Sequence, residues 1–164
     1  MKKSIKNTTS SSKKKTVTPI NKTVKKTVVK SKVKKTEKKN YESIPDDTVL
    51  VYHKPNCSTS RNVMDLLKKK KVKTMVRLYI EDSPTSKELE LLLAKLDMKP
   101  EELVRKKESY FQEKLKGLKL NDHEWIREMA ENPVLIERPV LIYKNSAVVG
   151  RPMEKVEEFL KKVK

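Results

Sequence analysis

The sequence predicts an α/β domain built on a mixed four-stranded sheet, and three observations support this prediction. A strand, an amphipathic helix and a second strand follow one another within about 30 residues from position 49, as in a βαβ unit. Two apolar runs joined by a polar link at 139–149 indicate a β-hairpin, which an amphipathic helix follows. The segment between these halves carries helical patterns.

The first half is a predicted parallel βαβ unit. Val49 to Tyr52 form an apolar run bounded by polar residues, which is typical of a buried strand. Thr74 to Ile80 are rich in β-branched and apolar residues and predict the second strand. The helix between them has an apolar stripe of Val63, Leu66 and Leu67. Such a unit has parallel strands and a right-handed crossover.

The middle of the chain predicts three helices. Thr85 to Glu88 fit a capping box, and four leucines at helical spacing follow it: Leu89, Leu92, Leu93 and Leu96. Pro100 can occupy the first turn of a short helix carrying Glu101 to Lys107. A third helix should run to Glu131, with Asp122 as its N-cap.

The last portion is a predicted hairpin followed by a helix. Pro139 to Tyr143 and Ala147 to Val149 are the two strands, joined by the three residues from Lys144 to Ser146. The final helix places Val156, Phe159, Leu160 and Val163 on one face. The order β-α-β, helices, β-β-α is that of the thioredoxin fold, with a helical insertion between the βαβ and ββα halves.

The charge divides the chain into two predicted regions. The net charge is +18, and residues 1–40 hold 15 Lys and one acidic residue, a net +14 that leaves +4 for the rest. We expect 1–47 to be a disordered Lys-rich tail, because like charges repel and little apolar area is available to bury. Residues 48–164 should form the folded domain. The tail is either a solvated arm, a nonspecific nucleic-acid contact through phosphates, or a targeting address.

Several classes of protein are excluded by composition. No run of 18 apolar residues exists, so we expect no membrane-spanning helix. The chain has no Cys/His cluster, so we expect no metal site. The single cysteine, Cys57, cannot form an internal disulfide, which indicates a reducing compartment and a cytoplasmic protein.

Cys57 is the candidate nucleophile. It lies between the first strand and the first helix, where free backbone N–H groups stabilise a thiolate. Ser60 supplies a hydroxyl, and His53 and Arg61 supply positive charge. The alternative is a buried structural cysteine, which is the common role of a free cysteine. With no second cysteine in the chain, oxidation of Cys57 must be reversed by a thiol from another molecule.

Three arginines are candidate anion ligands: Arg105, Arg138 and Arg151. Arg138 precedes Pro139 at the start of a strand, and Arg151 precedes Pro152 just after one, so both should project toward loops. A guanidinium presents a planar fork of donors that suits an oxyanion. The alternative for each is a solvated surface charge.

Four motifs in order resemble the glutaredoxin-coupled arsenate reductase family. The segment from Tyr52 to Asn62 is similar to that family's nucleophile segment. Leu103 to Lys106, Glu137 to Val140 and Gly150 to Pro152 resemble its three arginine motifs. The resemblance covers residues 49–163. Lys54 and the Lys107-Glu108 pair depart from the family pattern and indicate a sister branch.

The resemblance implies a mechanism and a set of partners. Cys57 would attack arsenate or a similar oxyanion, and glutathione and glutaredoxin would resolve the Cys–arsenic adduct. Glutathione would be a co-substrate, with no bound cofactor, and we expect a monomer. A cis peptide bond between Arg138 and Pro139 is also implied. The implied roles are substrate binding by Arg105, Arg138 and Arg151 and thiolate support by His53, Ser60 and Arg61.

A non-catalytic module is the alternative function. Spx-type transcription regulators share this fold and contact RNA polymerase without catalysis. They typically carry a Cys-X-X-Cys switch, whereas Ser60 stands three residues after Cys57 here. The sequence therefore favours the enzyme over the regulator.

Overall fold

The structure is a computed structural model that describes residues 44–163. Its elements follow the predicted order of strands and helices. In chain order they are β1 (Val49–Tyr52), α1 (Ser58–Lys69), β2 (Thr74–Arg77), α2 (Ser86–Leu96), α3 (Pro100–Leu103), the single π-helical turn η1 (Phe111–Leu115), α4 (Asp122–Glu131), the 3₁₀ turn η2 (Pro133–Leu135), β3 (Val140–Tyr143), β4 (Ser146–Val149) and α5 (Met153–Leu160).

The four strands form one mixed sheet in the order β2-β1-β3-β4. Strand β1 is parallel to β2 and antiparallel to β3, and β3 is antiparallel to β4. This arrangement confirms the predicted α/β class, the four-stranded mixed sheet and the helical insertion between its two halves.

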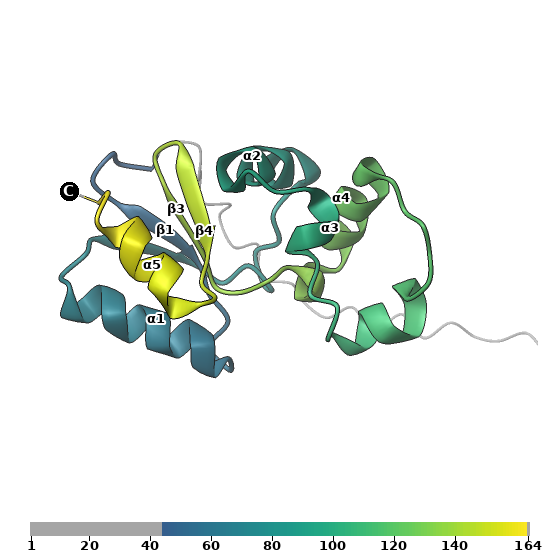
Figure 1. Ribbon diagram of the computed structural model, residues 1–164, viewed down its shortest axis with the longest axis horizontal. Coiled ribbons are helices and arrows are strands. Elements are labelled where there is room, and N and C mark those ends of the chain that lie inside the picture. The colour runs from purple at the N-terminus through teal and green to yellow at the C-terminus, as the bar shows by residue number, and fades with distance from the viewer. Residues whose placement is uncertain (1–43, 164) are drawn as a thin grey trace, which may run out of the picture. The chain divides into compact units, whose positions relative to one another are not determined.

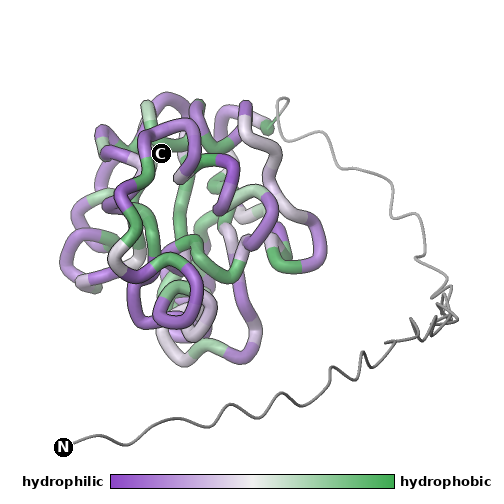
Figure 2. The backbone as a smooth tube through the Cα atoms, turned by 90° about the vertical axis from the view of Figure 1, so that its right-hand side faces the viewer, coloured by the Kyte–Doolittle hydropathy of each residue, from purple (hydrophilic) through white to green (hydrophobic). Residues whose placement is uncertain are grey.

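Helices cover both faces of the sheet (Figure 1). Val49 and Val51 of β1 pack with residues of α1 and α5, while Leu50 and Tyr52 pack with residues of α2, α3 and α4. Because side chains alternate along a strand, a strand buried on both faces is apolar throughout, as β1 is. Figure 2 shows these hydrophobic stretches in the middle of the described residues, with hydrophilic segments around them.

Several predicted boundaries were wrong by a few residues. Strand β2 ends at Arg77 rather than Ile80, because the Arg77 side chain donates to the carbonyls of Asp82 and Ser83 and holds the chain in a turn. Helix α3 ends at Leu103 rather than Lys107. Asn121, not Asp122, caps α4 by accepting the Glu124 N–H.

The hairpin link is also shorter than predicted, since Ser146 belongs to β4 and the turn consists of Lys144 and Asn145. Lys144 adopts a left-handed backbone with φ of 52°. The Arg138–Pro139 bond is cis, as the resemblance implied, and the Arg151–Pro152 bond is cis as well.

The predicted Lys-rich tail lies outside the described residues up to position 43. Its last residues, from Ile44, lead through a turn into β1, and Asp47 pairs with Lys73 at 2.8 Å. None of the helices in the described part of the chain is long and apolar enough to cross a membrane.

Candidate active site

The topology brings three separate segments to one end of the sheet. Tyr52, the last residue of β1, pairs with Val140, and Val140 pairs with Val149, the last residue of β4. Three segments therefore meet at this end of the sheet: the loop before Cys57, the residue before the cis-proline that precedes β3, and the chain after β4. Candidate residues from both halves of the sequence gather there.

Cys57 is the N-cap residue of α1 and is half-buried. Burial alone raises the pKa of its thiol, but the backbone N–H and hydroxyl of Ser60, the Arg138 guanidinium and the Thr59 N–H all lower it. The balance lowers the pKa of Cys57 from 9.0 to about 7. About half of the thiol is therefore ionised at neutral pH, which makes it a competent nucleophile.

Arg138 is buried beside the thiol. Its Nη1 donates to the Val134 carbonyl at 3.1 Å, and its Nη2 lies 3.3 Å from Glu108 Oε2. Burial lowers the pKa of this guanidinium, whereas Tyr79, Glu108 and Cys57 raise it. The net effect is a raised pKa, so the group stays cationic. Arg138 is thus a fixed positive charge next to the nucleophile.

Tyr79 completes the surroundings of the thiol. Its ring is fully buried and stacks on that of Tyr52 with centroids 5.9 Å apart. Burial raises the pKa of Tyr79 to about 12, although Arg138 acts in the opposite direction. The hydroxyl is therefore protonated at neutral pH, and its oxygen can accept a hydrogen bond from the Arg138 guanidinium.

Four buried polar atoms of this region have no hydrogen-bond partner of ordinary geometry: His53 Nδ1, Ser60 Oγ, Tyr79 OH and Arg138 Nε. The Ser60 hydroxyl and the Arg138 guanidinium nevertheless face the sulfur as donors, and they lower the pKa of Cys57. Unsatisfied buried polar groups carry a free-energy cost and mark places where a ligand can complete the hydrogen bonding.

Arg105 reaches this region through Glu108. Its Nε lies 3.3 Å from Glu108 Oε2, the oxygen that Arg138 also contacts, and its Nη1 lies 3.4 Å from Glu137 Oε2. Val104 bridges to Ile136, which anchors this segment beside the residues leading into β3. Arg105 and Arg138 are therefore brought together by a shared carboxylate.

Arg151 is exposed and contacts the first turn of α1. Its Nε and Nη2 donate to Thr59 Oγ1 at 3.1 and 2.6 Å, on the first turn of α1. A cavity of about 650 Å³ is lined by Arg105, Arg151 and Glu137 among others. The three arginines therefore lie around the N-terminal end of α1, with Arg138 in the direct environment of the sulfur.

His53 lies in the loop before Cys57, and Arg61 lies in the first turn of α1 after it. Arg61 donates to the Pro55 carbonyl at 3.0 Å and so braces the loop that carries the cysteine. Burial and the charge of Arg61 lower the pKa of His53, which favours its neutral form. The positive charge near the thiol at neutral pH thus comes from arginine.

Two residues of the site received no role from sequence reasoning. Tyr79 belongs to an apolar run that reads as a strand, and nothing in its spacing shows where its hydroxyl lies. Glu108 was noticed only as a departure from the family pattern. An acidic residue three positions after a candidate anion-binding arginine indicates an ion pair between the two, as Arg105 and Glu108 form here.

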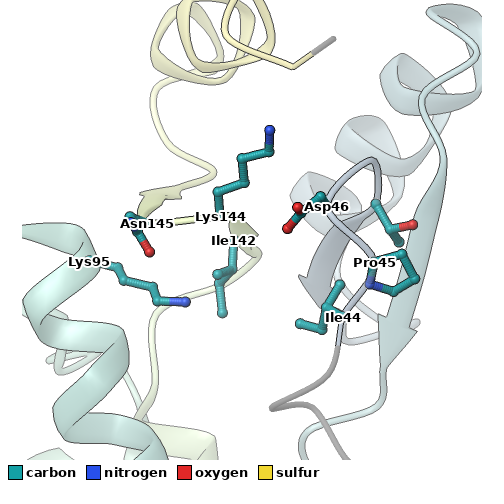
Figure 3. Close-up of a pocket in the computed structure, with 8 residues that line it drawn as sticks. Ile44, Pro45, Asp46, Lys95, Ile142, Lys144 and Asn145 are labelled. Atoms are coloured by element: carbon teal, nitrogen blue, oxygen red, sulfur yellow. The ribbon is translucent and has the colours of Figure 1, made fainter.

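Another cavity lies at the opposite end of β1 from Cys57 (Figure 3). Lys95, Lys144 and Asn145 line it together with the turn around Pro45. No cysteine lines it, and we assign it no chemistry. Within residues 44–163, no group of three or more His, Cys, Asp or Glu side chains could hold a metal ion.

Comparison with known proteins identifies the family. The ArsC family matches residues 52–159, which span β1 to α5 and include every candidate residue described above. The chain belongs to the ArsC family.

Relatives and solved structures agree with this assignment. The chain is 39% identical to the "Uncharacterized protein YfgD" of Escherichia coli (strain K12), over 68% of this chain and 96% of that protein. It is 33% identical to an arsenate reductase of Haemophilus influenzae, over 69% of this chain and 99% of the relative. Among solved structures, the arsenate reductase from Vibrio cholerae is 37% identical, with a TM-score of 0.64 over 68% of this chain and 96% of that chain.

Proposed function

We propose that this ArsC-family protein is a thiol-dependent oxyanion reductase that converts arsenate to arsenite through Cys57. The observation that carries the proposal is the thiol at the N-terminus of α1, with a pKa of about 7 and the Arg138 guanidinium in its environment. Relatives named arsenate reductase support arsenate as the substrate. Glutathione and glutaredoxin are the proposed electron donors.

The first step is attack by the Cys57 thiolate on arsenic. A sulfur–arsenic bond forms and one oxygen leaves as water after protonation. Arg138 stabilises the negative charge on the remaining oxygens, because a preorganised cation in a partly dry site interacts strongly with developing charge. Arg105 and Arg151 orient the oxyanion from the two sides.

The later steps return Cys57 to its starting state. Glutathione adds its sulfur to arsenic, and glutaredoxin attacks the glutathione sulfur. Arsenic accepts two electrons while two thiols become one mixed disulfide. Water then releases arsenite from Cys57, so arsenate and two thiols yield arsenite, a disulfide and water.

The test is turnover of the purified protein with arsenate, glutathione and glutaredoxin, followed by arsenic speciation. We expect Cys57→Ser to lower turnover at least about a thousandfold, because the nucleophile is lost, while its circular dichroism matches the parent. Reactions without glutaredoxin give the background of thiols alone. Retained turnover in Cys57→Ser would reject Cys57 as nucleophile, and a folded parent protein without turnover would favour the binding-module alternative.

A further inference from the structure

The two arginines that face each other at the site share an internal anion. One oxygen of Glu108, Oε2, lies 3.3 Å from Arg105 Nε, 3.3 Å from Arg138 Nη2 and 3.4 Å from Arg138 Nη1. A carboxylate oxygen held between two guanidinium groups has the same charge and donors as an oxygen of a bound oxyanion. Glu108 thus occupies the position that the proposed function gives to substrate.

The geometry shows that Glu108 is held weakly. Charge-assisted N–H···O bonds are normally about 2.7–2.9 Å long, and the part-buried pair Arg77–Glu88 reaches 2.7 Å, whereas each contact of the Glu108 carboxylate is 3.3 Å or longer. The Glu108 side chain is 22% exposed, so it has a route toward solvent. Its backbone N–H donates to the Arg105 carbonyl at 3.1 Å, which keeps it close when the side chain moves.

The charges of the site also favour an oxyanion that replaces a carboxylate over one that binds in addition to both carboxylates. Glu137 Oε2 lies 3.4 Å from Arg105 Nη1, so two carboxylates face the two guanidinium groups. Between Arg105 and Arg138, a dianion meets little net positive charge unless one of these carboxylates leaves. Glu108 is the carboxylate that contacts both arginines.

We propose that Glu108 is an internal competitor for the anion site: an oxyanion binds by taking the place of the Glu108 carboxylate between Arg105 and Arg138. The inference rests on the proposed function, since it assumes that these arginines hold the substrate. It adds that Glu108 sets how tightly any small dianion binds.

The experiment measures anion binding without turnover. Cys57 is alkylated with iodoacetamide at pH 9, where the thiol is ionised, and inorganic phosphate is titrated in to protect it. We expect Glu108→Gln to be protected at about tenfold lower phosphate concentration than the parent, because a neutral amide no longer repels the dianion or competes for the arginines. Glu108→Asp keeps the charge with a shorter reach and should lie between the two.

Asp47→Asn is the matched control, because Asp47 also pairs with a cation, Lys73 at 2.8 Å, but on the exposed surface just before β1. It should leave phosphate protection unchanged. Equal or weaker protection in Glu108→Gln, or no protection of any variant by phosphate, would overturn the proposal. The titration decides this even if the parent does not reduce arsenate, so the two proposals fail separately.

Discussion

Two buried arginines, Arg77 and Arg138, lie in the same small domain with different surroundings. Arg77 donates to Glu88 at 2.7 Å, to the Tyr52 hydroxyl at 3.1 Å and to two backbone carbonyls. Its guanidinium also lies over the Tyr52 ring, 5.3 Å from the centroid. This group is well paired and holds the turn after β2 against the start of α2.

Arg138 is buried to a similar degree but is bonded less completely. Its contacts with Glu108 are 3.3–3.4 Å long, and its Nε has no partner of ordinary geometry. The difference teaches that burial alone does not identify a functional arginine. An arginine with short bonds on all sides stabilises the fold, whereas one with spare donors beside a nucleophile can bind an anion.

The largest expected effect separates the two by stability. Arg77→Met should lower the free energy of unfolding by about 3 kcal/mol or more, because it leaves Glu88 and the turn carbonyls without their partner in a partly buried site. Arg138→Met should cost about 1 kcal/mol, since it removes longer and fewer bonds. Urea unfolding followed by circular dichroism measures both. Equal losses of stability would contradict the different roles of Arg77 and Arg138.

The next effect separates them by chemistry. Arg138→Met should lower kcat/KM for arsenate about a hundredfold, as is typical for losing a charge-stabilising donor. Arg77→Lys, assayed where it is folded, should stay within about threefold of the parent because the Arg77 guanidinium is engaged by Glu88 and the carbonyls of the turn. An inverted result would move the functional role to Arg77.

Arg138→Met should also change the pH dependence of the reaction of Cys57 with iodoacetamide. Only the thiolate reacts with iodoacetamide, so the parent rate should rise with a midpoint near the Cys57 pKa of about 7. Without the Arg138 cation the protonated thiol is favoured, so the midpoint moves to higher pH and the rate at pH 7 falls. An unshifted midpoint would show that the backbone N–H groups and the Ser60 hydroxyl ionise Cys57 without Arg138.

The smallest effect concerns Tyr79, whose ring stacks on that of Tyr52 and whose hydroxyl lies toward Arg138. Tyr79→Phe keeps the ring and removes a hydroxyl that has no ordinary hydrogen bond, so stability should change by less than about 1 kcal/mol. Turnover should fall by less than about tenfold. A loss as large as that of Arg138→Met would make this hydroxyl part of the catalytic machinery.

The sequence predicted the fold well because its elements carry strong periodic signals. The leucines of α2 recur at helical spacing behind a capping box that the structure contains, and β1 is apolar on both faces. The end of β2 was missed because Leu78, Tyr79 and Ile80 continue an apolar pattern. Only the tertiary contacts of Arg77 show that the chain turns there.

The candidate site was predictable in its residue types but not in its pairings. Cys57 and the arginines stand in recognisable motifs, whereas the contact of Arg138 with Glu108 and that of Arg105 with Glu137 each join residues 30 or more positions apart. Such pairings depend on the path of the chain from the helical insertion back to the sheet, which no local sequence pattern predicts.

The close approach of Gly150 to Pro139 has a consequence for altering this protein. A Cβ at position 150 would lie 2.5 Å from Pro139 Cγ, and the Gly150 N–H donates to the Pro139 carbonyl at 2.7 Å. Arg138 and Arg151 each adjoin one partner of this contact. Redesign of substrate preference must therefore keep glycine at position 150. It must also vary the two arginine loops together, because this contact joins them.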